Sequence, residues 1–532
     1  MTLLLKREMT RDVAHHDARV IAKGAGVNVL GNLAKLVRPM SSILMTRLFG
    51  VEVFGLYTLG WSVIDLLSKV GLFGLDKGVV KFVVRYRSDG NDDAVYRTLG
   101  QSLLIGLIVS MGMATLLSVI APLLSSHVFS KPELTSMLRV LACSIPFFTF
   151  SHVLLAATKA LKIMRFDAYV RSIAEPVVML AAVCLCFVVG WRVNGIAIAH
   201  LTAAIGGAAC AWYCFRRVFS SSACVTGIRE MKLWTEVTQF SLPVMCYDVL
   251  YILMMRLDAL MLGHFLPAVQ VGIYGVAIEV ALLTKKVRQW FEPIFTPIIA
   301  EFHYRQETER LEATFILVTR WIMTVNIACF FGIVLIGRDV LTVFGPVFAA
   351  GALSLTLLSL SQVIYGSMGS GDTVLLMAGH PYLNLLNTGL VLVLNGLLGF
   401  LLIPRYGIVG AAVGTLLSFT AMTILRLIEV STLLHISPFR RQLVKPIMAG
   451  SFAFMTALAV RSVFLGSGLL SLLACPTLFI TLYGVTLVVL RLPDEDQRLL
   501  RLGWSWLSSR IQGRHHEDAA VSDSREMRRP PC

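Results

Sequence analysis

The chain has 532 residues, of which 56% are hydrophobic and only 15% are charged, and its mean hydropathy is +0.75. Soluble domains cannot bury so large an apolar fraction, so the composition predicts a polytopic membrane protein. A net charge of +15 would suggest nucleic acid binding in a soluble protein. Here the cations fall in alternate loops between apolar runs, so we expect no nucleic-acid partner.

The apolar runs predict the fold class. A membrane-spanning helix needs about 20 apolar residues, and about fourteen runs reach that length. They do not alternate every second residue, as the strands of a β-barrel would. The sequence therefore predicts an all-α polytopic fold with about 14 transmembrane helices. The runs are centred near Val37, Ile64, Ile108, Pro146, Ala181, Ala203, Leu253, Glu279, Met323, Leu358, Val393, Val413, Met455 and Tyr483.

The distribution of lysine and arginine predicts the orientation. If the amino terminus is inside, cations gather in the inner segments near residues 6–23, 77–87, 159–165, 216–232, 305–310 and 440–445. The outer loops hold few. Since cytoplasmic loops carry the excess of cations, both termini are expected in the cytoplasm.

Two pairs of similar segments indicate an internal duplication. VFGLYTLGWSVIDLLSKV at 53–70 is similar to QVGIYGVAIEVALLTKKV at 270–287, which places Gly55 on Gly272 and Lys69 on Lys286. At nearly the same spacing, the segment after Trp191 matches the one after Tyr406. Such a repeat predicts two parallel six-helix lobes, with the last two helices as an addition.

The domain boundaries follow from the runs and the repeat. We expect a cytoplasmic tail at 1–19, an amino-terminal lobe at 20–218, a cytoplasmic linker at 219–233 and a carboxy-terminal lobe at 234–434. Two extra helices at 435–492 precede a cytoplasmic tail at 493–532, which contains an amphipathic helix.

Ionisable residues inside apolar runs are the candidate site. An ionisable group at membrane depth costs about 3 kcal/mol or more, so it normally faces the bundle interior or a water-filled cavity. Residues 236–300 carry the most and are the expected substrate wall. The candidates in this stretch are Asp248, Arg256, Asp258, Glu279, Lys285, Lys286 and Arg288.

Three more candidates lie in the first two runs. Arg38 stands near the centre of the first, directly before Pro39. Asp65 and Lys69 are four residues apart in the second, so they share a helix face and either neutralise each other or serve transport. Lys285 and Lys286 also have two interpretations: they line a cavity, or the chain leaves the membrane at Thr284 and they are cytoplasmic flanks.

The residues that are missing exclude other functions. The chain has no Walker loop and no long extracytoplasmic loop for a glycosyltransferase or ligase site, so it is expected to be a secondary transporter and not an enzyme. Most of the ten cysteines lie in apolar runs without a zinc-like partner set, so no metal site and no cofactor are expected.

If a proton or sodium gradient drives transport, the acids that could carry the ion are Asp65, Asp248, Asp258 and Glu279, although pairing with cations explains the same acids. Asn384, Asn387 and Asn395 are predicted to hold helices together.

Three stretches carry a resemblance to a known family. They are NLAKLVRPMSSILMTRLFGVEVFGLYTLGWSVIDLLSKVGLFGLDKG (32–78), RLDALMLGHFLPAVQVGIYGVA (256–277) and NLLNTGLVLVLNGLLGFLLIPRYGIVGAAVGTLLS (384–418). Through them the chain resembles the polysaccharide transporter family of the multidrug/oligosaccharidyl-lipid/polysaccharide exporter superfamily. With the number of runs, the resemblance covers residues from about 20 to 490.

The resemblance implies a V-shaped pair of lobes around a central cavity and alternating access. It implies a flippase in the bacterial inner membrane that moves an undecaprenyl-diphosphate-linked oligosaccharide outward, as O-antigen and lipid II flippases do. Its partners would be the lipid-linked oligosaccharide, membrane lipids and the proteins of polysaccharide polymerisation and chain length. Arg38 matches the arginine of the family's first-helix motif, while Arg256 lies one position out of register in the second lobe.

The implied substrate-binding residues are Arg38, Lys69, Arg256, Lys285, Lys286 and Arg288. Two other functions fit the same architecture. A multidrug or organic-cation antiporter would favour a cavity rich in carboxylates and aromatic rings, and a scaffold for polysaccharide assembly would transport nothing.

Overall fold

A computed structural model describes residues 37–191, 193–220, 236–305, 307–368, 371–434, 444–465 and 469–490, and in these ranges every regular element is a helix. Three predicted features lie outside the described residues. They are the amphipathic helix in the carboxyl tail, the linker from residue 221 to 233, and the part of the first span before residue 37. The all-α prediction is therefore confirmed for the described part of the chain.

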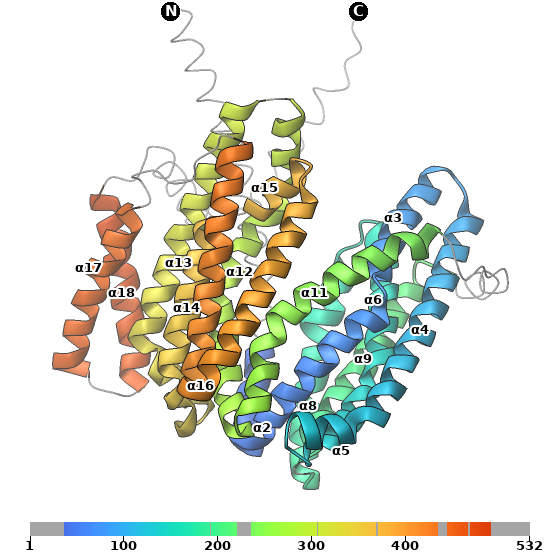
Figure 1. Ribbon diagram of the computed structural model, residues 1–532, viewed down its shortest axis with the longest axis horizontal. Helices are drawn as coiled ribbons and strands as arrows, with labels where there is room; N and C mark the ends of the chain where they lie inside the picture. The colour runs from blue at the N-terminus through green and yellow to red at the C-terminus, as the bar shows by residue number, and fades with distance from the viewer. Residues whose placement is uncertain are drawn as a thin grey trace, which may run out of the picture.

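The amino-terminal helices form the first bundle (Figure 1). They are α2 (Val37–Leu72), α3 (Leu75–Ser88), α4 (Asp92–Leu123) with its extension η2 (Leu124–Val128), α5 (Leu134–Ala142), α6 (Ser144–Ala160), α7 (Arg165–Ala168), η3 (Tyr169–Ala174), α8 (Glu175–Val189) and α9 (Gly195–Arg216).

The later helices form the second bundle and its peripheral pair. They are α11 (Glu236–Phe265), α12 (Ala268–Tyr304), α13 (Thr308–Phe344), η4 (Pro346–Gly351), α14 (Ala352–Ser367), α15 (Gly371–Met377), α16 (Pro381–Leu433), α17 (Val444–Val460), η6 (Arg461–Leu465) and α18 (Leu469–Val489).

Eleven helices in the described ranges are long and apolar enough to cross a membrane, and Ala474–Val489 is a shorter apolar helix. Two long helices contain a break at a glycine with positive φ, Gly50 in α2 (84°) and Gly407 in α16 (59°). Glycine adopts this region without the steric cost that a Cβ imposes. A multi-pass membrane protein is thus established, whereas the number of about 14 spans stays a prediction.

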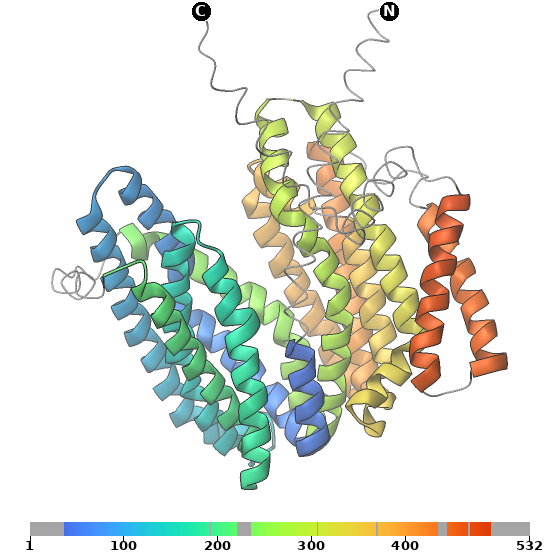
Figure 2. The same ribbon diagram turned by 180° about the vertical axis from the view of Figure 1, so that it is seen from behind.

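The two bundles touch at one end and diverge at the other, as both views show (Figures 1 and 2). At the joined end α2 packs against α12, and α11 packs against α16. One hydrophobic core continues through this contact, from Phe54 and Leu59 of α2 to Ile273 and Val276 of α12. The result is the V-shaped arrangement of two lobes that the resemblance implies.

Helix α11 belongs to both lobes. Its first half runs along α3, where a Cβ on Gly78 would lie 2.5 Å from the Ser241 hydroxyl oxygen. Its second half packs against α16, with Met261 in contact with Gly399. Helix α11, which is part of the substrate wall predicted at residues 236–300, therefore packs against both lobes.

Candidate functional site

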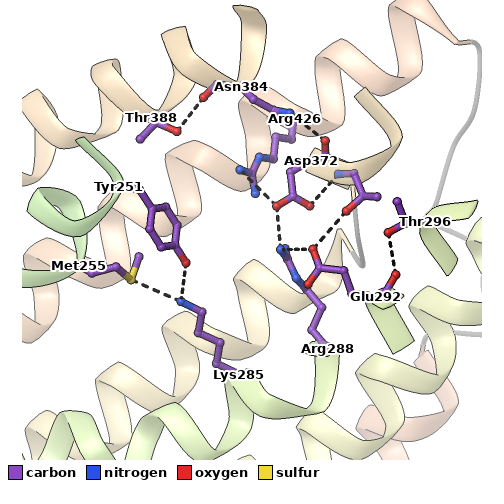
Figure 3. A network of polar contacts seen from close by, with 11 residues as sticks. Tyr251, Met255, Lys285, Arg288, Glu292, Thr296, Asp372, Asn384, Thr388 and Arg426 are labelled. Carbon is purple, nitrogen blue, oxygen red and sulfur yellow. Dashed lines mark hydrogen bonds and ion pairs between the residues drawn. The ribbon is translucent and has the colours of Figure 1, made fainter. Parts of the chain in front are cut away.

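A polar network connects helices of the second lobe, and three of its charged residues, Arg288, Asp372 and Arg426, lie in candidate membrane spans (Figure 3). Its centre is Asp372 on α15, whose Oδ2 lies 2.7 Å from Nη2 of Arg288 on α12 and 3.9 Å from Nη2 of Arg426 on α16. Arg288 also lies 3.4 Å from Oε1 of Glu292, one turn further along α12. Two guanidinium groups therefore share one carboxylate.

The short helix α15 fixes the position of Asp372. The carboxylate stands in the first turn, where Oδ1 accepts the backbone N–H of Thr373 at 2.9 Å, and a helix amino terminus favours negative charge. Nδ2 of Asn384, on α16, donates to the Asp372 carbonyl oxygen at 2.8 Å. Asn387 of the same helix donates to Glu429 at 2.7 Å. The prediction that these asparagines hold helices together is thus confirmed for Asn384.

Tyr365 on α14 holds both arginines. Its ring centroid lies 5.2 Å from the Arg288 guanidinium carbon and 5.1 Å from that of Arg426. A cation over an aromatic face is attracted by the ring quadrupole, most strongly where water is excluded. The tyrosine therefore fixes two like charges close together.

Lys285 adds a third cation at the edge of the network (Figure 3). Its Nζ donates to the Tyr251 hydroxyl at 3.1 Å and lies 3.4 Å from the sulfur of Met255, both on α11. In the described ranges no carboxylate lies within ion-pair distance of this amine. The residues of this network thus include three cations, Lys285, Arg288 and Arg426, and two carboxylates, Asp372 and Glu292, so positive charge is in excess among them.

Arg256 and Asp65 form a separate pair between the lobes. Nε and Nη2 of Arg256, on α11, lie 2.9 Å and 2.8 Å from Oδ2 of Asp65 on α2. Lys69, four residues after Asp65, makes no ion pair with a described residue. The ion-pair partner of Asp65 is thus Arg256 and not Lys69, and a transport role of Asp65 stays a prediction.

The other candidate acids have different surroundings. Asp248 pairs with Lys77 of α3 at 2.6 Å. Asp258 is buried, and its Oδ2 accepts hydrogen bonds from the Tyr274 hydroxyl at 3.0 Å and from the Thr415 hydroxyl. Glu279 accepts a hydrogen bond from Ser42 at 3.0 Å. Asp258 is thus held by neutral hydroxyl groups.

Two candidate cations remain. The Arg38 side chain lies outside the described residues, although its backbone belongs to α2. Lys286 is half-buried on α12. Of the candidate cations, the structure brings Lys285 and Arg288 into one network.

Sequence reasoning did not select Asp372, Arg426 or Tyr365. Asp372 lies in the candidate span Pro346–Met377 and Arg426 in Tyr382–Leu433. The four acids singled out from the sequence are therefore not the only ones at membrane depth. The signal that selected Arg256, an ionisable group inside an apolar run, would have found Asp372 and Arg426 too.

Relatives of known name match part of the chain. "Probable low-salt glycan biosynthesis flippase Agl15" of Haloferax volcanii is 29% identical over 213 residues, 39% of this chain and 45% of that protein. "Probable flippase AglR" of the same organism is 30% identical over 178 residues, 32% of this chain and 36% of that protein. The chain thus spans less than half the length of these curated relatives.

Solved structures match over most of the chain. Lipid II flippase MurJ, in an inward closed conformation, has a TM-score of 0.69 at 12% identity and covers 87% of this chain and 98% of its own. An inward-facing multidrug resistance MATE family transporter has a TM-score of 0.65 at 15% identity, over 79% of this chain and 96% of its own. At these identities the likeness shows a shared fold.

A family model described as "Polysaccharide biosynthesis protein" matches residues 21–303, which extend from the first span through α12. The match includes two of the three stretches that carry the resemblance, 32–78 and 256–277, and ends before the third at 384–418. Because it covers more than half of a chain whose two lobes have the transporter fold, the protein belongs to the polysaccharide biosynthesis protein family.

Proposed function

We propose that the protein is a flippase that moves a polyprenyl-diphosphate-linked oligosaccharide from the inner to the outer leaflet for cell-surface polysaccharide synthesis. The observation that carries the proposal is the excess of cations at membrane depth around Lys285, Arg288 and Arg426. The family, and the names of the Haloferax relatives, support a glycan-linked lipid as the cargo.

The chemistry of the cargo explains the cations. A diphosphate that crosses hydrocarbon loses its hydration, and the protein must replace it with charged donors. Arginine offers a planar fork that matches phosphate oxygens, and lysine a compact charge with three donors. Among the described residues no carboxylate pairs with Lys285, so an anion can bind its amine without breaking an ion pair, and we expect Lys285 to be the first contact.

Arg38 and Arg256 remain part of the proposed binding set, as cations near the start of each lobe, with Lys69 and Lys286. Arg256 must leave Asp65 before it can bind a phosphate oxygen. This exchange costs the ion pair, so we rank Arg256 below Lys285, which pairs with no carboxylate of the described residues, as a contact for the diphosphate.

The lobes support transport by alternating access. They touch at one end and diverge at the other, so reversing which end is closed would expose a bound head group first to one side and then to the other (Figure 1). We propose that the diverging end faces the cytoplasm, because Lys77, Lys81 and Arg85 of α3 lie there.

A proton or sodium gradient is the proposed energy source, with no other cofactor. Asp65 and Asp248 are already neutralised by Arg256 and Lys77. Among the described residues Asp258 has neutral hydrogen-bond partners, the hydroxyl groups of Tyr274 and Thr415 and the side chain of Asn395, and a carboxylate without a cationic partner can bind a small cation. We therefore assign ion coupling to Asp258 before Asp65, Asp248 and Glu279.

The remaining proposals concern the cellular setting. We infer a multi-pass protein of the bacterial inner membrane with both termini in the cytoplasm, and no catalytic step of its own. Proteins of polysaccharide polymerisation and chain-length control are the proposed partners.

Flux through reconstituted vesicles tests the proposal. Purified protein in vesicles that contain a fluorescent lipid-linked oligosaccharide should make this lipid accessible on the opposite leaflet. Lys285→Met keeps the apolar length of the side chain and removes the charge, so flux per folded molecule should fall about tenfold, the value of one charged hydrogen bond. The matched control Lys81→Met removes an exposed cation from α3 and should leave flux unchanged.

The MATE-like fold makes organic-cation export the second candidate. The same vesicles loaded with a fluorescent organic cation distinguish the two functions. Export of the cation, without movement of the lipid, would replace the flippase by an antiporter, and movement of neither would favour a scaffold.

A further inference from the structure

Asp372 is an incomplete partner for the two arginines that point toward it (Figure 3). Its Oδ2 lies 2.7 Å from Nη2 of Arg288 but 3.9 Å from Nη2 of Arg426, which is beyond hydrogen-bond distance. Arg426 exposes only 6% of its surface, and its buried Nε has no hydrogen-bond partner among the described residues. The carboxylate thus leaves a buried guanidinium donor unsatisfied.

The pair of Arg256 and Asp65 shows how complete such a contact is elsewhere in this chain. Nε and Nη2 of Arg256 lie 2.9 Å and 2.8 Å from Oδ2 of Asp65, so two donors of one guanidinium group are satisfied. A buried donor without an acceptor destabilises the folded protein, so stability alone does not explain the looser contact between Asp372 and Arg426. An anion with more oxygen atoms would complete the contact.

The diphosphate of the proposed cargo is such an anion. It presents more free oxygen atoms and more negative charge than a carboxylate, and the planar fork of arginine matches phosphate oxygens. Lys285 lies three residues before Arg288 on α12, so the two side chains are neighbours on one face of the helix. The two phosphate groups can therefore meet Lys285 and the pair of arginines together.

The Asp372 carboxylate can leave the arginines without losing every partner. Its side chain is 21% exposed, so an anion can reach it. Its Oδ1 accepts the backbone N–H of Thr373 at 2.9 Å, a bond that involves neither arginine. The backbone of α15 is fixed, because Val374 and Leu375 are buried in one core with Phe295. The exchange thus needs rotation of one side chain and no movement of the helix.

We propose that Asp372 is an internal competitor of the diphosphate. It occupies the pair of Arg288 and Arg426 before the diphosphate binds, yields the pair to the phosphate groups, and returns to it when the head group is released. This role rests on the proposed flippase function and adds a release step to it. Affinity is set mostly by the rate of dissociation, so cations that met no competitor would hold the head group too long for rapid transport.

Binding of inorganic pyrophosphate to the purified protein, measured by calorimetry, tests the competition. Asp372→Asn keeps the size of the side chain and an oxygen for the N–H of Thr373, but it removes the competing charge. The dissociation constant should fall about tenfold, the value of one charged hydrogen bond.

Glu292→Gln is the matched control for binding. It removes the same charge from a carboxylate that lies 3.4 Å from Arg288. The Glu292 side chain is 35% exposed, so water screens its charge, and the dissociation constant should change by no more than about threefold.

Flux distinguishes a competitor from an acid that only holds the arginines in place. In the reconstituted vesicles, Asp372→Asn should bind the fluorescent lipid-linked oligosaccharide more tightly and yet move it about tenfold more slowly, because release becomes limiting. Asp372→Ser should give the same combination. Its hydroxyl also accepts the N–H of Thr373, so it serves where the asparagine variant reduces folding.

Four outcomes would overturn the competitor role while wild-type flux stays intact. Weaker or unchanged pyrophosphate binding in the folded Asp372 variants, or loss of folded protein in both, would make the carboxylate a structural partner. Equal tightening by Glu292→Gln would show a general effect of charge. Tighter binding with unchanged or faster flux would show that release does not depend on Asp372. Failure of the proposed function gives a different result, since wild type would then neither bind pyrophosphate nor move the lipid, and both proposals would fall.

Discussion

Arg256 and Asp65 show how a single residue pair separates a structural role from a binding role. Arg256→Ala would leave the Asp65 carboxylate, 11% exposed at its side chain, without its partner between two helices. We expect the free energy of unfolding in detergent to fall, and the double variant Arg256→Ala/Asp65→Ala to recover part of the loss. A double-mutant cycle should give a coupling energy of about 1–3 kcal/mol.

Flux per folded molecule complements this cycle. If Arg256→Ala were as stable as wild type but transported no lipid-linked oligosaccharide, the arginine would serve the substrate and the ion pair would be incidental. Arg256→Lys separates the roles further, because lysine keeps the charge but cannot reproduce the fork that arginine offers a phosphate.

Asp258 is the residue at which ion coupling can be tested. Asp258→Asn keeps the size of the side chain and an oxygen that accepts from Tyr274, but it removes the charge. We expect folded protein whose flux no longer responds to a proton or sodium gradient. The measurement is flux in vesicles with and without each gradient.

Asp248→Asn is the matched control for coupling, since Asp248 is already neutralised by Lys77. It should retain the response to the gradient. An unchanged response in Asp258→Asn would remove this residue from the mechanism.

Among the helices, the crossing of α2 and α12 holds the joined end of the two lobes together. A Cβ on Gly55 would lie 1.9 Å from the carbonyl oxygen of Ala268, and one on Gly272 would lie 2.5 Å from that of Val51. The contact is reciprocal. Val51 lies four residues before Gly55, Ala268 lies four residues before Gly272, and each glycine meets the carbonyl oxygen that precedes the other glycine by one turn. The glycines matched by the sequence repeat thus meet each other in space.

Adding a methyl group should therefore open this end. With Gly55→Ala or Gly272→Ala the helices cannot approach as closely, and overpacking of about 1–3 kcal/mol should favour the conformation in which the joined end separates. We expect a cysteine at the buried position Val271, in a background without native cysteines, to react faster with a membrane-impermeant thiol reagent.

Gly112→Ala and Gly332→Ala are controls on α4 and α13, because no atom lies within 4 Å of a Cβ at either position. They should leave the labelling rate unchanged. Equal labelling rates in all four alanine variants would show that the close approach of α2 and α12 does not control how readily the joined end opens.

For the whole molecule, the lysines and arginines in alternate loops predict a membrane topology that cysteine labelling can test. The turn between α3 and α4, the end of α9 and the start of α11 lie together at the diverging end (Figure 1). A cysteine at Ser222, in the linker outside the described residues, should react only when reagent reaches the cytoplasm. A cysteine at the exposed Glu133, at the other end before α5, should react from outside. Labelling of Ser222→Cys in intact cells by an impermeant reagent would contradict both the topology and the scheme of two parallel lobes.

The sequence alone determined the class, the helical fold and the repeat. Apolar runs of bilayer length predict helices wherever they occur, since no other open structure satisfies the backbone in lipid. The equivalence of Gly55 and Gly272 also follows from sequence, because a duplication preserves spacing. Lys285 and Arg288 were selected for the same local reason, a charge inside an apolar run.

Only the tertiary structure decided which charges meet. The i, i+4 spacing makes Lys69 the local partner of Asp65, yet Asp65 pairs with Arg256, 191 residues away, because α11 crosses α2 at that level. Asp372 likewise gathers Arg288 and Arg426 from two other helices. Helical periodicity specifies the face on which a side chain lies, whereas the crossing of helices specifies what that face touches, and this depends on the packing of the whole bundle.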